Sequence, residues 1–439
     1  MGDIVFSGGR AEGEVSPPPS KSHTHRAIIM SALSEGRCRV SSPLLSFDTR
    51  STIGAVRRMG AEVLEEDGYL DIFTEELHSP DGPIDVGNSG TTLRIMTGIA
   101  SVFGSETVLD GDSSIRKRPM GPLLDCLSAA GVSCSSEGGK PPVRVRGPIA
   151  SPVLTIDGGV SSQFVTSLIM SAPLTGRPTD VRITGHLVSR PYIDITTEMM
   201  RRFGVEVGES AEEGCRVYHA EPQHYRPADY RVPADFSSAA FPLVAGGLAG
   251  KVTVRGMDPK DPQGDKRIVD VLKEAGCRVE ESGDSITCAS TGNLEGAEID
   301  MGDMPDLFPV VAVLLSTAKG RSRLYGAPQL RFKESDRIAL TEKMLRSLGA
   351  DITGTSDGCV INGVERLHGA RIEHCGDHRM LMAAAVASLV ADGPVSMDDD
   401  ACWNVSYPGF PEMMQSIGMK VERRRSRYSS FRDGAFTQR

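Results

Sequence analysis

Basic side chains stand at the start of several apolar segments, where a helix would begin. Lys21 and Arg26 flank the stretch SHTH, Arg94 follows NSGTTL, and Arg379 follows CGDH. A cation at a helix N-terminus opposes the helix dipole, so it is a poor structural choice there. The same position suits a bound anion, which backbone N–H groups and a basic side chain can hold together. The pattern therefore predicts a binding site for anionic ligands.

Other polar residues support this interpretation to different degrees. Ser, Thr, Asp and Asn at the same helix starts are ordinary N-terminal caps, so alone they do not require a ligand. A mixed-charge run such as RFKESDR is most often the solvated start of a helix. Three charged clusters nevertheless add to the cations above: SSIRKRPM (113–120), SRPYID (189–194) and QLRFKESDRIA (329–339).

The segments that carry these residues repeat along the chain, about every 70 residues. Each copy is an apolar, helix-like run followed by Gly or Asp-Gly and a short strand-like run. A second, more charged helix then ends at Gly and leads to a further strand. The six apolar runs are Arg26–Val40, Thr92–Leu109, Gln163–Ile183, Ser238–Val254, Phe308–Leu324 and Arg379–Met397.

The character of the first helix in each copy predicts an unusual layering. SLIMSAPL (167–174), FPVVAVLL (308–315) and MLMAAAVASLV (380–390) are apolar nearly all round, and such helices are buried. The second helices carry charge on one face and should be partly solvated. We therefore expect an α/β fold in which buried helices are surrounded by sheets. It is built from six helix–strand–helix–strand units.

A chain of 439 residues is expected to form at least two hydrophobic cores, so the six units divide as three plus three. We expect a continuous lobe, residues 20–232, and a split lobe, residues 1–19 plus 233–439. The junction lies near HYRPADYRVPAD (224–235), and three prolines (17–19) make the other crossing stiff and extended. The site for anions then lies in the cleft between the lobes.

Composition narrows the class of protein. The formal net charge is −10, which does not favour a nucleic-acid partner, and the basic segment 421–439 is interpreted as a solvated terminus. The longest apolar run, 380–391, is too short to span a bilayer, and the first residues lack a signal-peptide core. Nine cysteines without a CxxC pair indicate reduced thiols in a cytoplasmic protein.

A metal site is not expected from the histidine spacing. His23 and His25 flank Thr24, and His374 and His378 are four residues apart, but neither pair has carboxylate or Cys partners in a known metal pattern.

Eight motifs in order resemble one family: PPPSKSHTHRA, NSGTTLR, RKRPM, SSQF, SRPYID, MPDLFP, FKESDR and GDHRM. They are similar to the motif set of the EPSP synthase (3-phosphoshikimate 1-carboxyvinyltransferase) family, over about Lys21 to Pro408. The resemblance implies two lobes, each an inside-out barrel of three repeats, that close on their substrates. It implies transfer of the enolpyruvyl group of phosphoenolpyruvate to the 5-hydroxyl of shikimate 3-phosphate. The reaction is an addition and elimination without metal or organic cofactor, and we expect a monomer.

The resemblance also implies roles for individual residues. Asp306 would be the base for the 5-hydroxyl, Glu334 would carry the proton at the methylene carbon, and Lys21 would act at the departing phosphate. Phosphoenolpyruvate would be bound by Lys21, Gly90, Arg118, Gln163, Arg337 and Arg379. Shikimate 3-phosphate would be bound by Lys21, Ser22, Arg26, Ser161, Ser162, Gln163, Ser189, Asp306, Gln329 and Lys333. On pattern alone Asp306 could equally be a helix cap, and His378 is a secondary candidate.

Two positions depart from the family pattern. Family members carry a Lys three residues before the Pro of the C-terminal motif, where this chain has Val405 in CWNVSYPGF. Gln329 stands where those members have Asn, which keeps the amide chemistry. One contact to a substrate carboxylate is therefore missing or is supplied by another side chain.

Two other functions are weighed against this one. UDP-N-acetylglucosamine enolpyruvyl transferase shares the fold and the donor, but it has a Cys in the loop where this chain has Ser113 and Ser114. A catalytically silent or RNA-processing relative on a similar repeat fold is disfavoured by the acidic charge and by the low aromatic content, 5%.

Overall fold

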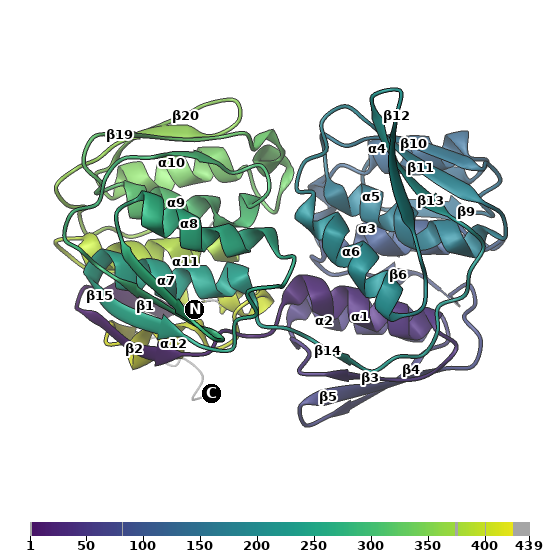
Figure 1. The fold of residues 1–439 in the computed structure, drawn as a ribbon, viewed down its shortest axis with the longest axis horizontal. Coiled ribbons are helices and arrows are strands. Elements are labelled where there is room, and N and C mark those ends of the chain that lie inside the picture. The colour runs from purple at the N-terminus through teal and green to yellow at the C-terminus, as the bar shows by residue number, and fades with distance from the viewer. Residues whose placement is uncertain (1, 81, 374–375, 400, 425–439) are drawn as a thin grey trace, which may run out of the picture.

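The computed structural model describes residues 2–80, 82–373, 376–399 and 401–424, and it shows two lobes side by side (Figure 1). Each lobe has its own hydrophobic core. The core of the continuous lobe is built from residues between Ala27 and Val232. The core of the split lobe takes Ile4, Phe6 and Ala11 from the start of the chain and the rest from residues 236–419. His374 and residues 425–439 of the basic terminus lie outside the described residues.

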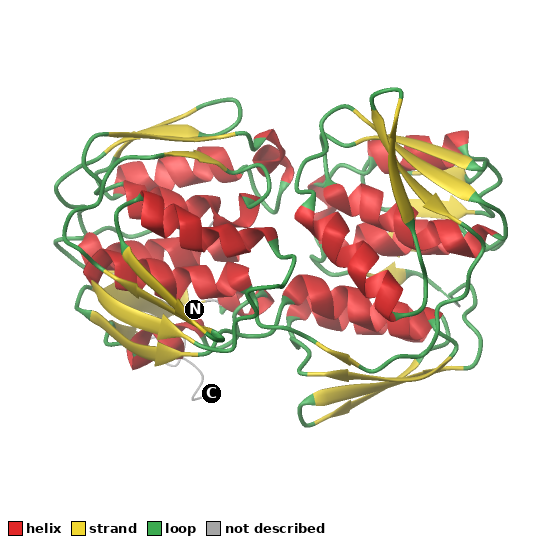
Figure 2. Ribbon diagram, viewed as in Figure 1, coloured by secondary structure: helices red, strands yellow, loops and turns green. Residues whose placement is uncertain are grey.

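Helices occupy the centre of each lobe and sheets its outside, as Figure 2 shows. The central helices are buried along nearly their whole length, which confirms the layering expected from their apolar sequences. A short 3-10 helix, Pro305–Leu307, precedes one of them. The central helices are α1 (Lys21–Leu33), α3 (Gly90–Ala100), α5 (Ser162–Ser171), α7 (Phe236–Ala249), α9 (Phe308–Leu315) and α11 (His378–Ala387).

Each central helix is followed in its unit by a second helix that ends at a glycine. These glycines have positive φ, and the residue after each donates its N–H back to a carbonyl of the helix, as Ala61 does to Val56 at 3.0 Å. The glycines are Gly60, Gly131, Gly204, Gly276, Gly349 and Gly418. The helices are α2 (Phe47–Arg58), α4 (Gly121–Ala129), α6 (Pro191–Arg202), α8 (Ile268–Glu274), α10 (Arg337–Ser347) and α12 (Phe410–Ser416).

The strands of the continuous lobe form three four-stranded sheets, one for each unit. In sheet order these are β14 (Tyr230–Arg231), β3 (Gly36–Ser41), β5 (Tyr69–Thr74) and β4 (Glu62–Glu66); β6 (Ile84–Asp85), β7 (Thr107–Asp110), β9 (Val143–Arg146) and β8 (Ser133–Ser135); β10 (Val153–Asp157), β11 (Thr179–Thr184), β13 (Cys215–Ala220) and β12 (Gly208–Glu212).

The split lobe has two four-stranded sheets and one three-stranded sheet among its described residues. In sheet order these are β16 (Arg278–Ser282), β17 (Ser285–Ala289), β15 (Gly250–Val254) and β2 (Ala11–Val15); β18 (Glu298–Asp300), β19 (Arg321–Tyr325), β21 (Cys359–Asn362) and β20 (Asp351–Gly354); β22 (Val395–Asp399), β1 (Gly2–Ser7) and β23 (Lys420–Arg424).

The helix–strand–helix–strand pattern expected for each unit was incomplete. In five units the second helix leads to an antiparallel hairpin rather than to one strand, as β4 and β5 show. A further strand pairs in parallel with the strand that follows the central helix, as β10 does with β11 across α5. Parallel strands need such a helical crossover, and several of the added strands have only two or three residues, too few for a periodic pattern.

The chain crosses between the lobes twice, and the two crossings are hydrogen-bonded to each other. The Ser20 N–H donates to the Pro233 carbonyl at 2.8 Å, and the Asp235 N–H donates to the Pro18 carbonyl at 3.0 Å. Before the first crossing, β1 and β2 pair with strands of the split lobe. Every helix among the described residues is too short or too polar to cross a lipid bilayer.

Candidate active site

The N-termini of central helices bring polar side chains from both lobes together. Ser20, Ser89 and Ser161 cap α1, α3 and α5 by accepting backbone N–H bonds, and Asp377 does the same for α11. These caps confirm the helix starts expected from the sequence. Residues of the first turns therefore point into a common space between the lobes, a cavity of about 60 Å³.

Asp306 is the carboxylate on which the cations of this space converge. Its Oδ1 lies 2.7 Å from Arg337 Nη1 and 3.4 Å from Lys333 Nζ, and its Oδ2 lies 3.2 Å from Arg379 Nη2. Burial alone would raise the pKa of Asp306. The attraction of four nearby cations is larger than the effect of burial and holds that pKa well below its ordinary value; these are Arg379, Lys333, Arg337 and Lys21. Asp306 is therefore a carboxylate at neutral pH.

Glu334 shares one of these arginines. Its Oε2 lies 2.8 Å from Arg337 Nη2, and its Oε1 lies 4.0 Å from Arg118 Nη1 on the continuous lobe. Burial alone would raise the pKa of Glu334. The opposing effect of its charged neighbours is larger, so the pKa lies well below its ordinary value; these neighbours are Arg337, Arg118, Lys21 and His378. Glu334 thus lies between cations of both lobes in its charged form.

Arg337 is held in place by a third carboxylate. Its side chain is 1% exposed, and its Nε lies 2.8 Å from Oδ2 of the fully buried Asp377. Burial lowers the pKa of Arg337, yet Asp377, Glu334 and Asp306 raise it well above its ordinary value. The guanidinium therefore stays charged and connects three carboxylates in a fixed geometry.

Lys21 is positioned by a residue of another helix. Its Nζ lies 3.1 Å from Oδ2 of Asp48, in the first turn of α2. Ser46 and Thr49 form a capping box around this turn, which sets the position of the carboxylate. The ammonium group of Lys21 is thereby directed into the cavity at the start of α1.

Arg26 is buried among uncharged partners. Its Nε donates to Thr196 Oγ1 at 2.8 Å, its Nη1 to the Ser22 carbonyl at 2.9 Å and its Nη2 to the Tyr192 carbonyl at 3.2 Å. Burial lowers its pKa to about 10. A guanidinium in this position is still charged at neutral pH, and an anion in the cavity would compensate its charge.

The start of α5 is linked to that of α3. Gln163 Oε1 accepts from Arg94 Nη1 at 2.8 Å, and Gln163 Nε2 donates to Thr91 Oγ1 at 2.9 Å. Next to them the backbone of Gly90 touches Arg118, because a Cβ on Gly90 would lie 2.4 Å from Arg118 Nη1. A side chain at this position would displace the Arg118 guanidinium from its present place.

Gln329 and Ser189 meet where the lobes touch. Gln329 Nε2 donates to the Gly302 carbonyl at 2.9 Å and to Ser189 Oγ at 3.3 Å. Because the carbonyl requires a donor, this contact fixes the orientation of the amide. Gln329 Oε1 is buried and has no hydrogen-bond partner among the described residues, so it is available to a donor in the cavity.

No group of three or more His, Cys, Asp and Glu side chains that could bind a metal occurs within the described residues. The charged groups at the cavity are mostly cations. Burial, with Lys21 and Arg379 nearby, lowers the pKa of His378 to about 3, so this side chain is neutral. The arrangement is one for binding anions with cationic side chains.

The EPSP synthase (3-phosphoshikimate 1-carboxyvinyltransferase) family has a sequence model that matches residues 5–414. The chain belongs to the EPSP synthase family. This result confirms the resemblance seen in the eight motifs.

Relatives with the name 3-phosphoshikimate 1-carboxyvinyltransferase match along most of the chain. The protein of Methanocorpusculum labreanum is 46% identical over 418 residues, which cover 94% of this chain and 98% of that protein. The protein of Methanothermobacter thermautotrophicus is 42% identical over 423 residues, which cover 95% and 98%. A solved EPSP synthase from Acinetobacter baumannii has a TM-score of 0.78 at 27% identity and covers 96% of this chain and all of that chain.

Most of the residues that family resemblance singled out come together in the structure. Those that line the cavity are Lys21, Ser22, Arg26, Gly90, Arg118, Ser161, Ser162, Gln163, Ser189, Asp306, Gln329, Lys333 and Glu334. Arg337 and Arg379 lie behind the lining, turned toward Asp306. Their roles in an EPSP synthase reaction remain predictions.

Several residues of the EPSP synthase site were not selected from the sequence. Tyr192 lines the cavity and occurs in a motif that was noted without a role for it, whereas Arg94, which also lines the cavity, was among the cations predicted to bind an anion. Tyr192 donates its hydroxyl hydrogen to Asp306 Oδ2 at 3.2 Å. Asn88 Oδ1 accepts from Arg118 Nη2 at 2.8 Å. Asp48 gave no signal, because an Asp in a first helical turn is ordinary.

Val405 lies in a short 3-10 helix, Cys402–Val405, in the split lobe. This helix contacts α2 of the continuous lobe. The position where the family resemblance led us to expect a Lys therefore lies in a short helix that contacts the other lobe.

Proposed function

We propose that this chain transfers the enolpyruvyl group of phosphoenolpyruvate to the 5-hydroxyl of shikimate 3-phosphate and releases phosphate. Membership of the EPSP synthase family supports this activity. The observation that carries it at the level of the site is the group of Arg337, Arg379 and Lys333 around Asp306, between the two lobes. This group supplies cations for two substrate phosphates and a substrate carboxylate, and it places the carboxylate of Asp306 beside them.

The acceptor, shikimate 3-phosphate, binds mainly at the starts of α1 and α5. Ser22, Arg26 and Lys333 supply donors and positive charge, and Arg26 gains the anionic partner that its uncharged neighbours do not give it. The unpaired Oε1 of Gln329 accepts a hydroxyl hydrogen of the acceptor. The other contacts come from Ser161, Ser162, Gln163, Ser189, Asp306 and Lys21.

The donor, phosphoenolpyruvate, binds to guanidinium groups of both lobes. Arg118 approaches over the bare backbone of Gly90, and Arg337 and Arg379 approach from the split lobe. Lys21 and Gln163 complete the set. Planar guanidinium groups match phosphate and carboxylate oxygens in pairs, which orients the donor as well as binding it.

Asp306 removes the proton of the 5-hydroxyl. Without substrates its pKa is held well below its ordinary value by four cations, which makes it a weak base. Substrate phosphates and carboxylates pair with the same cations, so each bound anion weakens their effect on Asp306 and raises its pKa. Binding of both substrates thus increases the basicity of Asp306 when the acceptor hydroxyl is in place.

Two further groups complete the reaction. Glu334, held between Arg118 and Arg337, carries the proton to and from the methylene carbon. Lys21 stabilises negative charge on the bridging oxygen as phosphate leaves. Each of these groups touches reacting atoms and none requires a metal or an organic cofactor. Because one chain supplies all of them, we further infer a monomer. The cysteine usage of the sequence supports a location in the cytoplasm.

Thermal denaturation with and without candidate acceptors tests the identity of the acceptor. A ligand that binds only the folded state raises the melting temperature, by about 3 °C at a hundred times its Kd for a chain of this length. Shikimate 3-phosphate is expected to give this rise and UDP-N-acetylglucosamine none. A rise with the nucleotide sugar alone would replace the proposed acceptor.

A further inference from the structure

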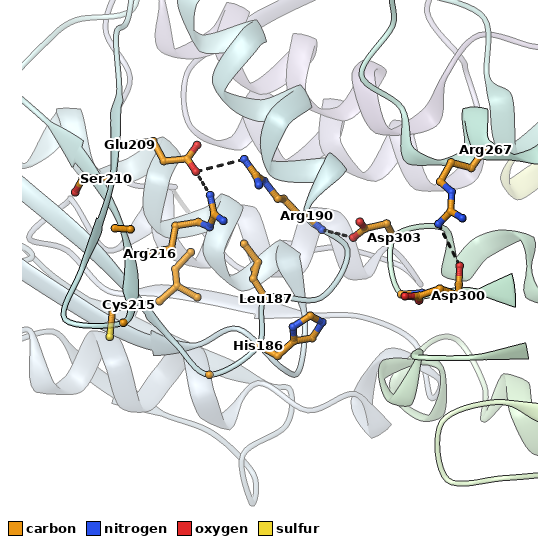
Figure 3. Close-up of a pocket in the computed structure, with 15 residues that line it drawn as sticks. His186, Leu187, Arg190, Glu209, Ser210, Cys215, Arg216, Arg267, Asp300 and Asp303 are labelled. Carbon is orange, nitrogen blue, oxygen red and sulfur yellow. Dashed lines mark hydrogen bonds and ion pairs between the residues drawn. The ribbon is translucent and has the colours of Figure 1, made fainter. Parts of the chain in front are cut away.

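The N-terminus of α6 obtains its cap from the other lobe. Arg190, at the N-cap position, makes no side-chain cap bond, and Pro191 has no N–H to donate. The backbone N–H of Arg190 donates instead to Oδ1 of Asp303 in the split lobe, at 3.2 Å (Figure 3). A carboxylate at this end of a helix also interacts favourably with the helix dipole.

The preceding residue makes a second contact across the lobes. The Ser189 N–H donates to the Gly302 carbonyl at 3.2 Å, next to Asp303. Ser189 has φ 56°, in the left-handed region that a non-glycine residue adopts only when its surroundings hold it there. The Gly302 carbonyl also accepts from Gln329 Nε2. This loop of the split lobe therefore fixes both the conformation of Ser189 and its contact with Gln329.

The contact lies beside a wide groove with charged walls. A groove of about 840 Å³ runs along its outer side, with walls from both lobes. In Figure 3 the side chain of Arg190 turns away from Asp303 toward Glu209, at 3.4 Å, on its own lobe. The groove walls include Arg216, Arg267 and Asp300. Since these walls are charged and accessible to water, the lobes can part here without exposing a large apolar surface.

We propose that Asp303 and the Gly302 carbonyl form a latch that holds the lobes closed and positions Ser189 for the acceptor substrate. The role of Ser189 rests on the proposed function. Asp303 does not line the cavity, so it is a positioning residue that acts through the start of α6. Tyr192, in the first turn of α6, donates its hydroxyl hydrogen to Asp306, so the latch is also connected to the cations around that carboxylate.

Kinetics of an Asp303→Ala variant test the latch. Loss of one hydrogen bond is expected to raise KM for shikimate 3-phosphate about threefold to tenfold, with kcat within about twofold of the unaltered protein. Asp303→Asn keeps an acceptor oxygen and is expected to restore KM to within about twofold of the unaltered protein. Asp284→Ala removes an exposed carboxylate of the same lobe, away from the start of α6, and it is the matched control.

Hydrogen exchange of segment 187–193 gives a readout that does not depend on activity. Without any substrate, exchange at Ser189 and Arg190 is expected to be faster in Asp303→Ala than in the unaltered protein, and unchanged in Asp303→Asn and Asp284→Ala. Equal exchange and equal KM in Asp303→Ala and the unaltered protein would overturn the latch. Equal increases in KM and in exchange rate in Asp303→Ala and Asp303→Asn would also overturn it.

The proposed function can fail separately from the latch. If the unaltered protein released no phosphate with shikimate 3-phosphate, the reaction would be wrong. The exchange comparison would still decide whether Asp303 joins the lobes.

Discussion

Arg337 connects the charged residues of the site at the scale of single side chains. Its three nitrogens each meet a different carboxylate, on Asp306, Glu334 and Asp377. Because Arg337 and Asp377 are buried, neither can exchange its partner for water. One guanidinium therefore links the proposed base, Asp306, to the other two carboxylates of the network.

Replacing Arg337 by Lys is expected to lower both activity and stability. A lysine keeps the charge, but its single ammonium group cannot reach all three carboxylates. Disrupting a buried pair typically costs about 3–5 kcal/mol, and we expect urea denaturation to show a loss of that order together with a fall in kcat of at least about a hundredfold.

Arg278→Lys provides the control in the same lobe. Its ion pair with Glu280 at 3.5 Å is largely exposed, so its loss is expected to cost less than about 1 kcal/mol. Equal losses of stability and activity in the two variants would show that the three-carboxylate network contributes no more than an exposed ion pair.

Asp265 gives a pH dependence of stability with a defined sign. Burial, followed by repulsion from Asp306, raises its pKa to about 7, above the ordinary value near 4. Between about pH 4 and pH 7 the folded state therefore holds a proton that the unfolded state has lost. Folding stability contributed by this group then falls as pH rises through that window.

An Asp265→Asn variant tests this sign. It is expected to match the unaltered protein near pH 4 and to be the more stable of the two at pH 8, in free energies of unfolding measured by urea denaturation. Asp284→Asn, at an exposed position, should leave the pH profile unchanged. An Asp265→Asn variant that is less stable at pH 8 would contradict the assignment of a buried, proton-binding carboxylate.

At the scale of elements, each unit couples a buried helix to a glycine-terminated one. The N-terminal caps and the positive-φ glycines set where each helix begins and ends. Most of the residues proposed to bind the substrates lie at or near helix N-termini, and the glycine turns lead into the strands of the outer sheets. The two ends of each unit thus have separate tasks.

Two glycines of α2 are expected to respond oppositely to alanine. Gly54 lies inside the helix, and a Cβ added there would have no neighbour within 4 Å, so Gly54→Ala should stabilise by about 0.5–1 kcal/mol. Gly60 ends the helix with φ 103°, and a Cβ there would lie 2.8 Å from the His78 ring. Gly60→Ala should destabilise by at least about 1 kcal/mol. Urea denaturation of both variants measures the change in the free energy of unfolding. A change of the same sign in both variants would contradict the role of Gly60 as the C-terminal cap of α2.

The helices could be predicted from the sequence because their signals are local. Runs such as 308–315 are apolar all round, and each second helix ends in a glycine. The short strands could not be predicted in this way. β6 and β14 have two residues each. They are strands only because their backbones pair with β7 and β3, which lie elsewhere in the sequence.

At the scale of the whole molecule, the site depends on the meeting of two lobes. Lys21, Arg118 and Gln163 belong to one lobe, and Asp306, Glu334 and Arg379 to the other. The lobes are joined covalently only at the two paired crossings near Ser20 and Asp235. Motion about this pair would assemble or dismantle the site as a unit.

Most of the site could be predicted because its motifs resemble those of a known family. Asp48 and Asn88 could not, since they act by holding Lys21 and Arg118 rather than through a pattern of their own. The cross-lobe contact of Asp303 was equally hidden, because it joins residues more than a hundred positions apart. Such contacts come from tertiary packing, which local sequence patterns do not record.

Closure of the lobes on the acceptor is expected in solution. The cations of the two lobes repel one another across the cleft, so without ligand the closed form, which the latch stabilises, is expected to exchange with an open one. The phosphate of shikimate 3-phosphate would reduce the repulsion and shift this equilibrium toward the closed form. Small-angle scattering should therefore show the radius of gyration fall toward about 22 Å, the value for a compact chain of this length, when this ligand is added. Shikimate, which lacks the phosphate, is the control. An unchanged radius with both ligands would count against closure.

Phosphate release from phosphoenolpyruvate, with shikimate 3-phosphate as acceptor, tests the central claim most directly. The unaltered protein should release phosphate only when the acceptor is present. Asp306→Ala and Asp306→Asn should reduce the rate by about a hundredfold or more while circular dichroism shows an intact fold. Release without the acceptor, no release from a well-folded protein, or full activity in both variants would contradict the proposed reaction and its base.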